Sequence, residues 1–150
     1  MIVADTSVAV KWVFDEDHSV LALRLFRDCA ARGEAVVAPR LLPFEVTNVI
    51  RQRVRRQGLG MTDAADAFEQ FLRFGVTLLP GDDASRQPCI TARWRSPTGY
   101  DLSATYDAHY VALAESLGCE LWTADQRLLR RRLGPQMPSV RWIADYRAAV

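Results

Sequence analysis

Short runs of apolar residues alternate along this chain with longer segments in which apolar residues recur every three or four positions. The short runs are typical of buried strands, and the longer segments are typical of amphipathic helices. Strands that alternate with helices indicate a parallel sheet between helical layers. The pattern therefore predicts an α/β fold, a three-layer α/β/α sandwich with a short-stranded, mainly parallel central sheet, with strands over residues 1–4, 35–38, 76–79, 120–123 and 140–142.

The helical segments have recognisable starts and stops. Gly33, Gly58 and Gly118 each follow a helical pattern, as helix-terminating glycines do, and Thr62 with Asp63 predicts an N-cap. The predicted helices cover residues 7–14, 18–31, 42–57, 62 to 73 or 74, 84–94, 103 or 105 to 117, and 126–133. The sequence contains no linker, repeat or low-complexity tract, so residues 1–150 are predicted to form a single domain.

Four acidic residues stand where this fold would place a binding site. Asp5 and Asp125 directly follow the first and fourth predicted strands, and ligands of parallel sheets bind beyond the carboxyl ends of strands. Glu45 and Asp107 lie on the apolar stripes of two predicted helices, where a carboxylate needs a partner. We expect the four carboxylates to converge at one edge of the sheet.

Each acid also has an ordinary structural interpretation. Asp5 and Asp125 precede helices and are typical N-caps. Asp107, near the start of its helix, suits a cap or the helix dipole. Glu45 is explained equally well by an ion pair with Arg40 or Arg51. These alternatives remain open at the level of the sequence.

Converging carboxylates favour a divalent cation. Mg²⁺ or Mn²⁺ takes oxygen ligands and keeps several waters, which leaves coordination positions for a phosphodiester. Such an ion lowers the pKa of a bound water and neutralises charge on the leaving oxygen. The hydroxyls of Thr6, Ser7 and Thr123 neighbour these acids and are expected to orient them.

The amino-acid composition limits the classes of protein to which this chain can belong. The chain of 150 residues is 49% hydrophobic and 25% charged, with a formal net charge of +1, which is ordinary for a soluble globular protein and gives no overall attraction to polyanions. Lys11 is the only lysine among 19 basic residues. Arginine suits phosphate recognition, although a GC-rich genome produces the same bias.

Three separated cysteines, Cys29, Cys89 and Cys119, match neither a zinc spacing nor a disulfide framework and are expected to be small core residues. Asp5 and Lys11 interrupt the N-terminal apolar stretch, which is unlike a secretory signal, and no run is long enough to span a membrane. We therefore expect a cytoplasmic protein with no membrane partner.

Four segments together resemble the successive motifs of PIN-domain ribonucleases, most closely those of VapC-type toxins. They are IVADTSV (2–8), PFEVTNV (43–49), YDAHYVALAE (106–115) and TADQRLL (123–129). The resemblance implies Mg²⁺- or Mn²⁺-dependent cleavage of RNA, homodimerisation, and inhibition by a cognate antitoxin protein encoded nearby. It assigns catalysis and metal binding to Asp5, Glu45, Asp107 and Asp125, with Ser7 and Thr123 at the usual hydroxyl positions.

Other residues have weaker functional claims. Asp101 is an additional acid close to the Asp107 motif, and an exposed loop position explains it more simply. His109 points to a different helix face from Asp107 and is interpreted as a structural or surface residue. His18 is interpreted as marking a helix N-terminus. The arginines at 51, 53, 55 and 56 fit either a phosphate-contacting surface or a solvated helix face, and those at 130–132 are equally ambiguous. The aromatic residues Trp12, Phe14, Phe68, Phe71 and Phe74 indicate core or a dimer interface.

Two other functions compete with the nuclease. A phosphatase would use Asp5 as its nucleophile, but Ser7 stands where such sites commonly carry a second acid. A PIN-like domain that binds RNA or protein without cutting it is the alternative from another class. Four retained carboxylates argue against that second alternative.

Overall fold

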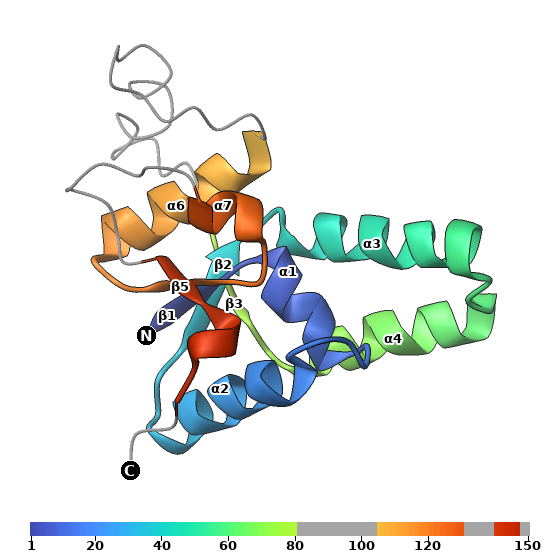
Figure 1. The fold of residues 1–150 in the computed structure, drawn as a ribbon, viewed down its shortest axis with the longest axis horizontal. Coiled ribbons are helices and arrows are strands. Elements are labelled where there is room, and N and C mark those ends of the chain that lie inside the picture. Colours follow the sequence, from blue (N-terminus) through green and yellow to red (C-terminus); the bar gives the residue numbers. More distant parts are fainter. Residues whose placement is uncertain (81–104, 131–139, 148–150) are drawn as a thin grey trace.

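The computed structural model describes residues 1–80, 105–130 and 140–147. A five-stranded, all-parallel sheet forms its centre, with the strands in the order β3-β2-β1-β4-β5 (Figure 1). The strands are β1 (Ile2–Ala4), β2 (Val36–Pro39), β3 (Thr77–Leu79), β4 (Leu121–Thr123) and β5 (Val140–Trp142). The α/β fold predicted from the apolar pattern is confirmed, and each predicted strand is present to within one residue at either end.

Helices connect the strands. They are α1 (Thr6–Ala9), α2 (Ser19–Ala31), α3 (Leu42–Gln57), α4 (Met61–Arg73), α6 (Thr105–Leu117) and α7 (Gln126–Arg130), with short 3-10 turns η1 (Val10–Trp12) and η2 (Ile143–Asp145). Helix α6 packs on β1, β2 and β4, whereas α2 packs on η1 and η2. Helices α3 and α4 pack against each other and extend away from the sheet as a pair (Figure 1).

The strand order creates a switch point between β1 and β4. From β1 the chain progresses through β2 to β3 in one direction, and it then returns to place β4 on the other side of β1. Parallel connections of the usual right-handed kind therefore leave the sheet on opposite faces at this point. The two connections diverge beyond the carboxyl ends of β1 and β4, which is where doubly wound sheets bind ligands.

Most predicted helix boundaries are confirmed. Helix α3 covers the predicted residues, and Gly58 after it has φ +72°, a conformation that glycine adopts without a Cβ clash. The predicted N-cap of α4 is wrong, because the helix begins at Met61 with Gly60 as its cap. Extended backbone at Gly60 lets the helix start there, which leaves Thr62 and Asp63 inside its first turn. The helix predicted over 84–94 lies outside the described residues.

The core lies between the sheet and its helices. The ring of Trp12 stacks on Phe74 at 5.2 Å and lies 5.3 Å from Phe26, and Phe71 is buried. These aromatic residues are therefore core, as one of the two sequence interpretations held. Cys29 is buried and Cys119 half-buried, both as free thiols. No helix in the described ranges has both the length and the apolarity that crossing a bilayer requires.

Candidate active site

Asp5 occupies the carboxyl end of β1 and caps α1. Its Oδ1 accepts hydrogen bonds from the backbone N–H of Val8 at 3.1 Å and from the hydroxyl of Ser7 at 2.6 Å. Its Oδ2 accepts a hydrogen bond from the hydroxyl of Thr123 at 2.6 Å. The predicted capping role is confirmed, and Asp5 is at the same time tied to the neighbouring strand β4.

Ser7 and Thr123 join the two connections at the switch point. The Ser7 hydroxyl accepts a hydrogen bond from the backbone N–H of Ala124 at 2.7 Å, and the Thr123 hydroxyl accepts one from the N–H of Asp125 at 2.9 Å. Each hydroxyl thus donates to Asp5 and accepts from the chain that leaves β4. The side chain of Asp5 is held in one orientation by Thr123, which is 118 residues away in sequence, as well as by its neighbours Ser7 and Val8.

Burial makes the charge on Asp5 costly. The side chain is only 6% exposed, and this desolvation raises its pKa from 3.8 to about 6, against the opposing hydrogen bonds from Ser7, Thr123 and Val8. The charge of Asp107 raises the pKa further, which places that carboxylate within electrostatic reach. A nearby cation would relieve both effects.

Glu45 is held by two hydroxyls. In the first turn of α3, its Oε2 accepts hydrogen bonds from Tyr110 at 2.5 Å and from Thr6 at 2.8 Å, and these two hydroxyl oxygens lie 2.8 Å apart. Burial and the charge of Glu45 raise the pKa of Tyr110 well above its ordinary value, so it remains a donor. Neither Arg40 nor Arg51 forms an ion pair with Glu45 within the described ranges, so the ion-pair interpretation is not realised.

The remaining two acids lie in the first turn of α6 and at the start of α7. Asp107 is half-buried, on the face of α6 that carries the buried Tyr110. Asp125 caps α7, because its Oδ1 accepts a hydrogen bond from the N–H of Arg127 at 2.7 Å. Tyr110 links α6 to Glu45, and Thr123 links Asp5 to Asp125. Thr6, the neighbour of Asp5, donates to Glu45, and the charge of Asp107 acts on Asp5, so the four acids lie around the carboxyl end of β1.

The donor set can be tested for a hard divalent cation. A carboxylate oxygen has two acceptor positions, and both are used on Asp5 Oδ1 and on Glu45 Oε2. One position remains on Asp5 Oδ2, and Glu45 Oε1 and Asp125 Oδ2 accept no hydrogen bond from the described residues. Oxygens fixed on one side and open on the other fit Mg²⁺ or Mn²⁺, which combine one or two carboxylates with water and phosphate ligands.

The convergence is incomplete in its geometry. Among residues 1–80, 105–130 and 140–147, no three acidic, histidine or cysteine side chains surround a single point as a finished metal site. Asp101 lies outside the described residues. His109 is half-buried on α6, and His18 is exposed at the N-cap of α2, as expected for a helix N-terminus.

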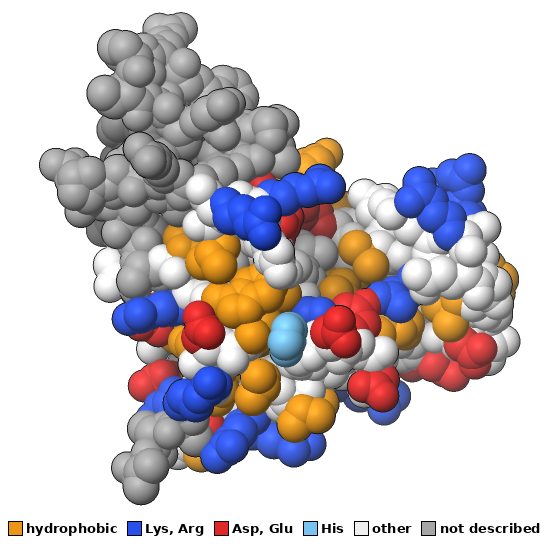
Figure 2. All heavy atoms as spheres, in the orientation of Figure 1, with side chains coloured by type: hydrophobic (Ala, Val, Ile, Leu, Met, Phe, Trp, Pro, Cys, Tyr) orange, Lys and Arg blue, Asp and Glu red, His pale blue; other side chains and the backbone are white. Residues whose placement is uncertain are grey.

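The arginines near Glu45 divide into two groups. Arg53 faces inward, where its guanidinium lies 4.1 Å from the centroid of the Phe14 ring and pairs with Glu16. The side chains of Arg51, Arg55 and Arg56 are exposed. Figure 2 shows Lys and Arg side chains over the outer part of α3 and over α7, with acidic side chains beside those over α7. The exposed arginine surface of α3 therefore consists of Arg51, Arg55 and Arg56, and Arg53 is not part of it.

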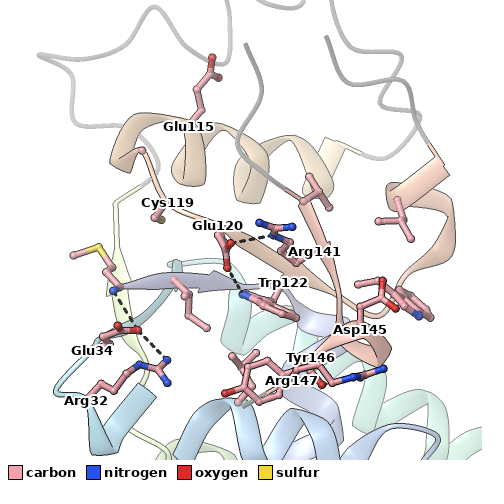
Figure 3. A pocket seen from close by; sticks show the side chains of 17 residues that line it. Arg32, Glu34, Glu115, Cys119, Glu120, Trp122, Arg141, Asp145, Tyr146 and Arg147 are labelled. Atoms are coloured by element: carbon pink, nitrogen blue, oxygen red, sulfur yellow. Dashed lines mark hydrogen bonds and ion pairs between the residues drawn. The ribbon is translucent and has the colours of Figure 1, made fainter. Parts of the chain in front are cut away.

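A separate cavity of about 980 Å³ lies near the amino ends of the strands, and its described lining includes none of the four acids. Figure 3 shows Glu120 between Trp122 and Arg141, to which it is hydrogen-bonded at 3.1 and 3.0 Å. Arg32 pairs with Glu34 on the same wall at 3.2 Å. The carboxylates of Glu34 and Glu120 in this lining are therefore each paired with an arginine.

Sequence reasoning missed the role of Tyr110. In the sequence this residue stands out only as part of the segment YDAHYVALAE (106–115), whereas the structure shows its phenol donating a hydrogen bond to Glu45. A tyrosine one turn after Asp107 on a buried stripe was the available signal, because a buried phenol requires a hydrogen-bond partner.

Comparison with known proteins agrees with this architecture. Residues 2–133 match the model of the PIN domain, and the chain belongs to the PIN-domain family. Ribonuclease VapC9 of Mycobacterium tuberculosis is 34% identical over 129 residues, covering 85% of this chain and 88% of that protein. Ribonuclease VapC12 of the same species is 33% identical over 131 residues, covering 85% and 89%, and a VapC ribonuclease of Mycobacterium bovis is 34% identical over 129 residues, covering 85% and 88%. The predicted resemblance to VapC-type PIN ribonucleases is confirmed.

Proposed function

We propose that this chain, as one PIN domain over residues 1–150, is a metal-dependent endoribonuclease and the toxin of a toxin–antitoxin pair. The observation that carries the proposal is the fixed orientation of the Asp5 carboxylate at the switch point between β1 and β4. The Thr123 hydroxyl donates a hydrogen bond to Asp5 and accepts one from the N–H of Asp125, so it holds both acids. The VapC ribonucleases to which the chain is similar supply the reaction class.

In this proposal Asp5, Glu45, Asp107 and Asp125 hold Mg²⁺ or Mn²⁺. The bound ion supplies Lewis-acid chemistry for hydrolysis of the phosphodiester by water. Ser7 and Thr123 keep Asp5 oriented, and Thr6 and Tyr110 keep Glu45 oriented, so the open carboxylate oxygens are positioned before substrate arrives. Burial of Asp5 makes its interaction with a cation stronger than it would be at an exposed position.

For the assembly, we extend the similarity to the VapC ribonucleases. We propose a cytoplasmic homodimer that acts on RNA and is inhibited by a cognate antitoxin protein. The phosphatase alternative lacks the second acid that such sites commonly carry two residues after the nucleophile, because Ser7 stands there.

The test is cleavage of total cellular RNA by the antitoxin-free protein, with Mg²⁺, with Mn²⁺ and with a chelator. The comparison includes Asp5→Asn and, as a matched control, Asp66→Asn at an exposed position of α4. We expect discrete fragments that require metal and disappear with Asp5→Asn alone. Intact RNA with folded, metal-loaded protein across a broad RNA panel would instead favour the domain that binds without cutting.

A further inference from the structure

Tyr106 occupies an unusual place on α6. It shares a helix face with Tyr110 and Leu113, at spacings of four and seven residues, and both of these are buried. Tyr106 itself is 58% exposed. Because it lies in the first turn, it projects beyond the packed part of the helix on the same face that contacts Glu45. Its exposed ring belongs to the residue directly before Asp107, in the first turn of α6.

Phe44 has the corresponding place on α3. It is 73% exposed and immediately precedes Glu45 in the first turn of that helix. Helical side chains lean toward the N-terminus of their helix, which for α3 is the end nearest the site. The hydrogen bond between Tyr110 and Glu45 brings the first parts of α3 and α6 together. Two acids of the proposed nuclease are thus each preceded by an exposed aromatic ring.

We propose that Tyr106 and Phe44 stack on the nucleobases that flank the cleaved phosphodiester of single-stranded RNA. This inference rests on the proposed function. In this arrangement the phosphate lies at Asp107 and Glu45, and the bases on either side of it stack on these rings. Aromatic rings bind such bases through their faces with little sequence preference. The rings are substrate-binding residues that act on unpaired RNA, because a duplex leaves the faces of its bases covered.

Binding is tested in the Asp5→Asn background, so that the RNA remains intact. The probes are short single-stranded RNA oligonucleotides that carry the fluorescent base 2-aminopurine and random neighbouring bases. Stacking quenches this fluorophore. We expect Tyr106→Leu and Phe44→Leu, which keep an apolar side chain but lose the ring, to reduce the quenching and weaken binding about ten-fold each. Tyr106→Phe and Phe44→Tyr keep the ring and should bind like the parent.

The matched control is Val20→Ala, a change at a residue of α2 that is 77% exposed but belongs to no part of the site. In cleavage assays with otherwise wild-type protein, the leucine variants should raise KM about ten-fold with kcat within about two-fold of wild type. Quenching does not depend on catalysis, so its loss in the leucine variants supports the stacking proposal even if no RNA is cut. Leucine variants that cut and bind RNA like Val20→Ala would overturn stacking while leaving the nuclease intact, and would assign the rings to a protein partner if antitoxin binding alone were weakened.

Discussion

The phenol of Tyr110 lies 2.5 Å from Oε2 of Glu45 and donates a hydrogen bond to it. Tyr110 belongs to α6, which precedes β4, and Glu45 belongs to α3, which follows β2. Tyr110 is only 2% exposed, so its position is set by core packing. A residue fixed by the core therefore determines where the Glu45 carboxylate points, and Thr6 shares this role.

Tyr110→Phe should reduce catalysis without unfolding the protein. The substitution keeps the packed ring and removes one hydrogen bond to a charged group, a loss typically of about 1.5–3 kcal/mol. Because this hydrogen bond orients the Glu45 carboxylate for catalysis, its loss should lower kcat for RNA cleavage at least about ten-fold and leave KM nearly unchanged. Steady-state kinetics on a defined RNA provides the measurement.

The matched control is Tyr146→Phe. Tyr146 is similarly buried, and its hydroxyl donates to Asp28 at 2.6 Å, away from the four acids. This variant should lose stability to a similar degree and keep its kcat. Equal losses of kcat in the two variants would show that Tyr110 acts only through general stability.

Thr123→Val should weaken both the fold and the site. Thr123 is fully buried, and its hydroxyl serves Asp5 Oδ2 and the N–H of Asp125. Valine has nearly the same shape but leaves these groups without that partner, at a cost of about 1–3 kcal/mol in the free energy of unfolding. Urea denaturation measures the change. Thr123→Ser should recover most of it, whereas Thr47→Val, at an exposed helix position, should have little effect.

The sequence was most informative where local signals determine the structure. Helix α3 was predicted over its full length, and its end was marked by Gly58, which has a positive φ there. The place of Asp5 was also predictable, since the carboxyl end of a buried strand is defined by pattern alone. Its cap role and its proposed site role were posed as alternatives, but the structure shows that the cap bond uses only one acceptor position.

Contacts between distant residues were not predictable in this way. The partners of Glu45 lie 39 and 65 positions away in sequence, and no periodicity reveals which hydroxyls the fold brings to it.

The direction of Arg53 could be predicted from the sequence, because Arg53 follows Val46, Val49 and Ile50 at helical spacing and so continues the apolar stripe. That spacing indicated an inward-facing arginine, but the run of neighbouring arginines obscured it.

Arg53 and Arg55 should consequently behave in opposite ways. Arg53→Met removes a guanidinium that lies over Phe14 and pairs with Glu16, and we expect a loss of about 1 kcal/mol in the free energy of unfolding. Arg55→Met, at an exposed position, should change stability by less than about 0.5 kcal/mol. If the outer face of α3 contacts phosphates, Arg55→Met should also lower the salt dependence of RNA binding by about 0.7 in log–log slope. Chemical denaturation and binding titrations at several salt concentrations separate these two effects, and an unstable Arg55→Met protein would contradict the assignment.

Asp5 should make the stability of the metal-free protein depend on pH. Its pKa is about 6 in the folded state against 3.8 ordinarily, so between these values the folded protein holds a proton that the unfolded chain has released. Stability therefore falls as the pH rises from about 4 to 6, and the loss is complete above that window. The shift corresponds to about 3 kcal/mol.

Asp5→Asn removes this titration, and its free energy of unfolding relative to wild type should rise by up to about 3 kcal/mol between about pH 4 and pH 7. Urea denaturation with a chelator at each pH provides the measurement. In Ser7→Ala, the pH range over which stability falls should extend to higher pH than in wild type. The reason is that the Ser7 hydroxyl is one of the groups that lower the pKa of Asp5. At neutral pH, Mn²⁺ should raise the Tm of wild type more than that of Asp5→Asn, since a bound cation offsets the buried charge. A constant stability difference across this pH range, with equal Mn²⁺ responses, would contradict both the elevated pKa and the proposed role of Asp5 in holding metal.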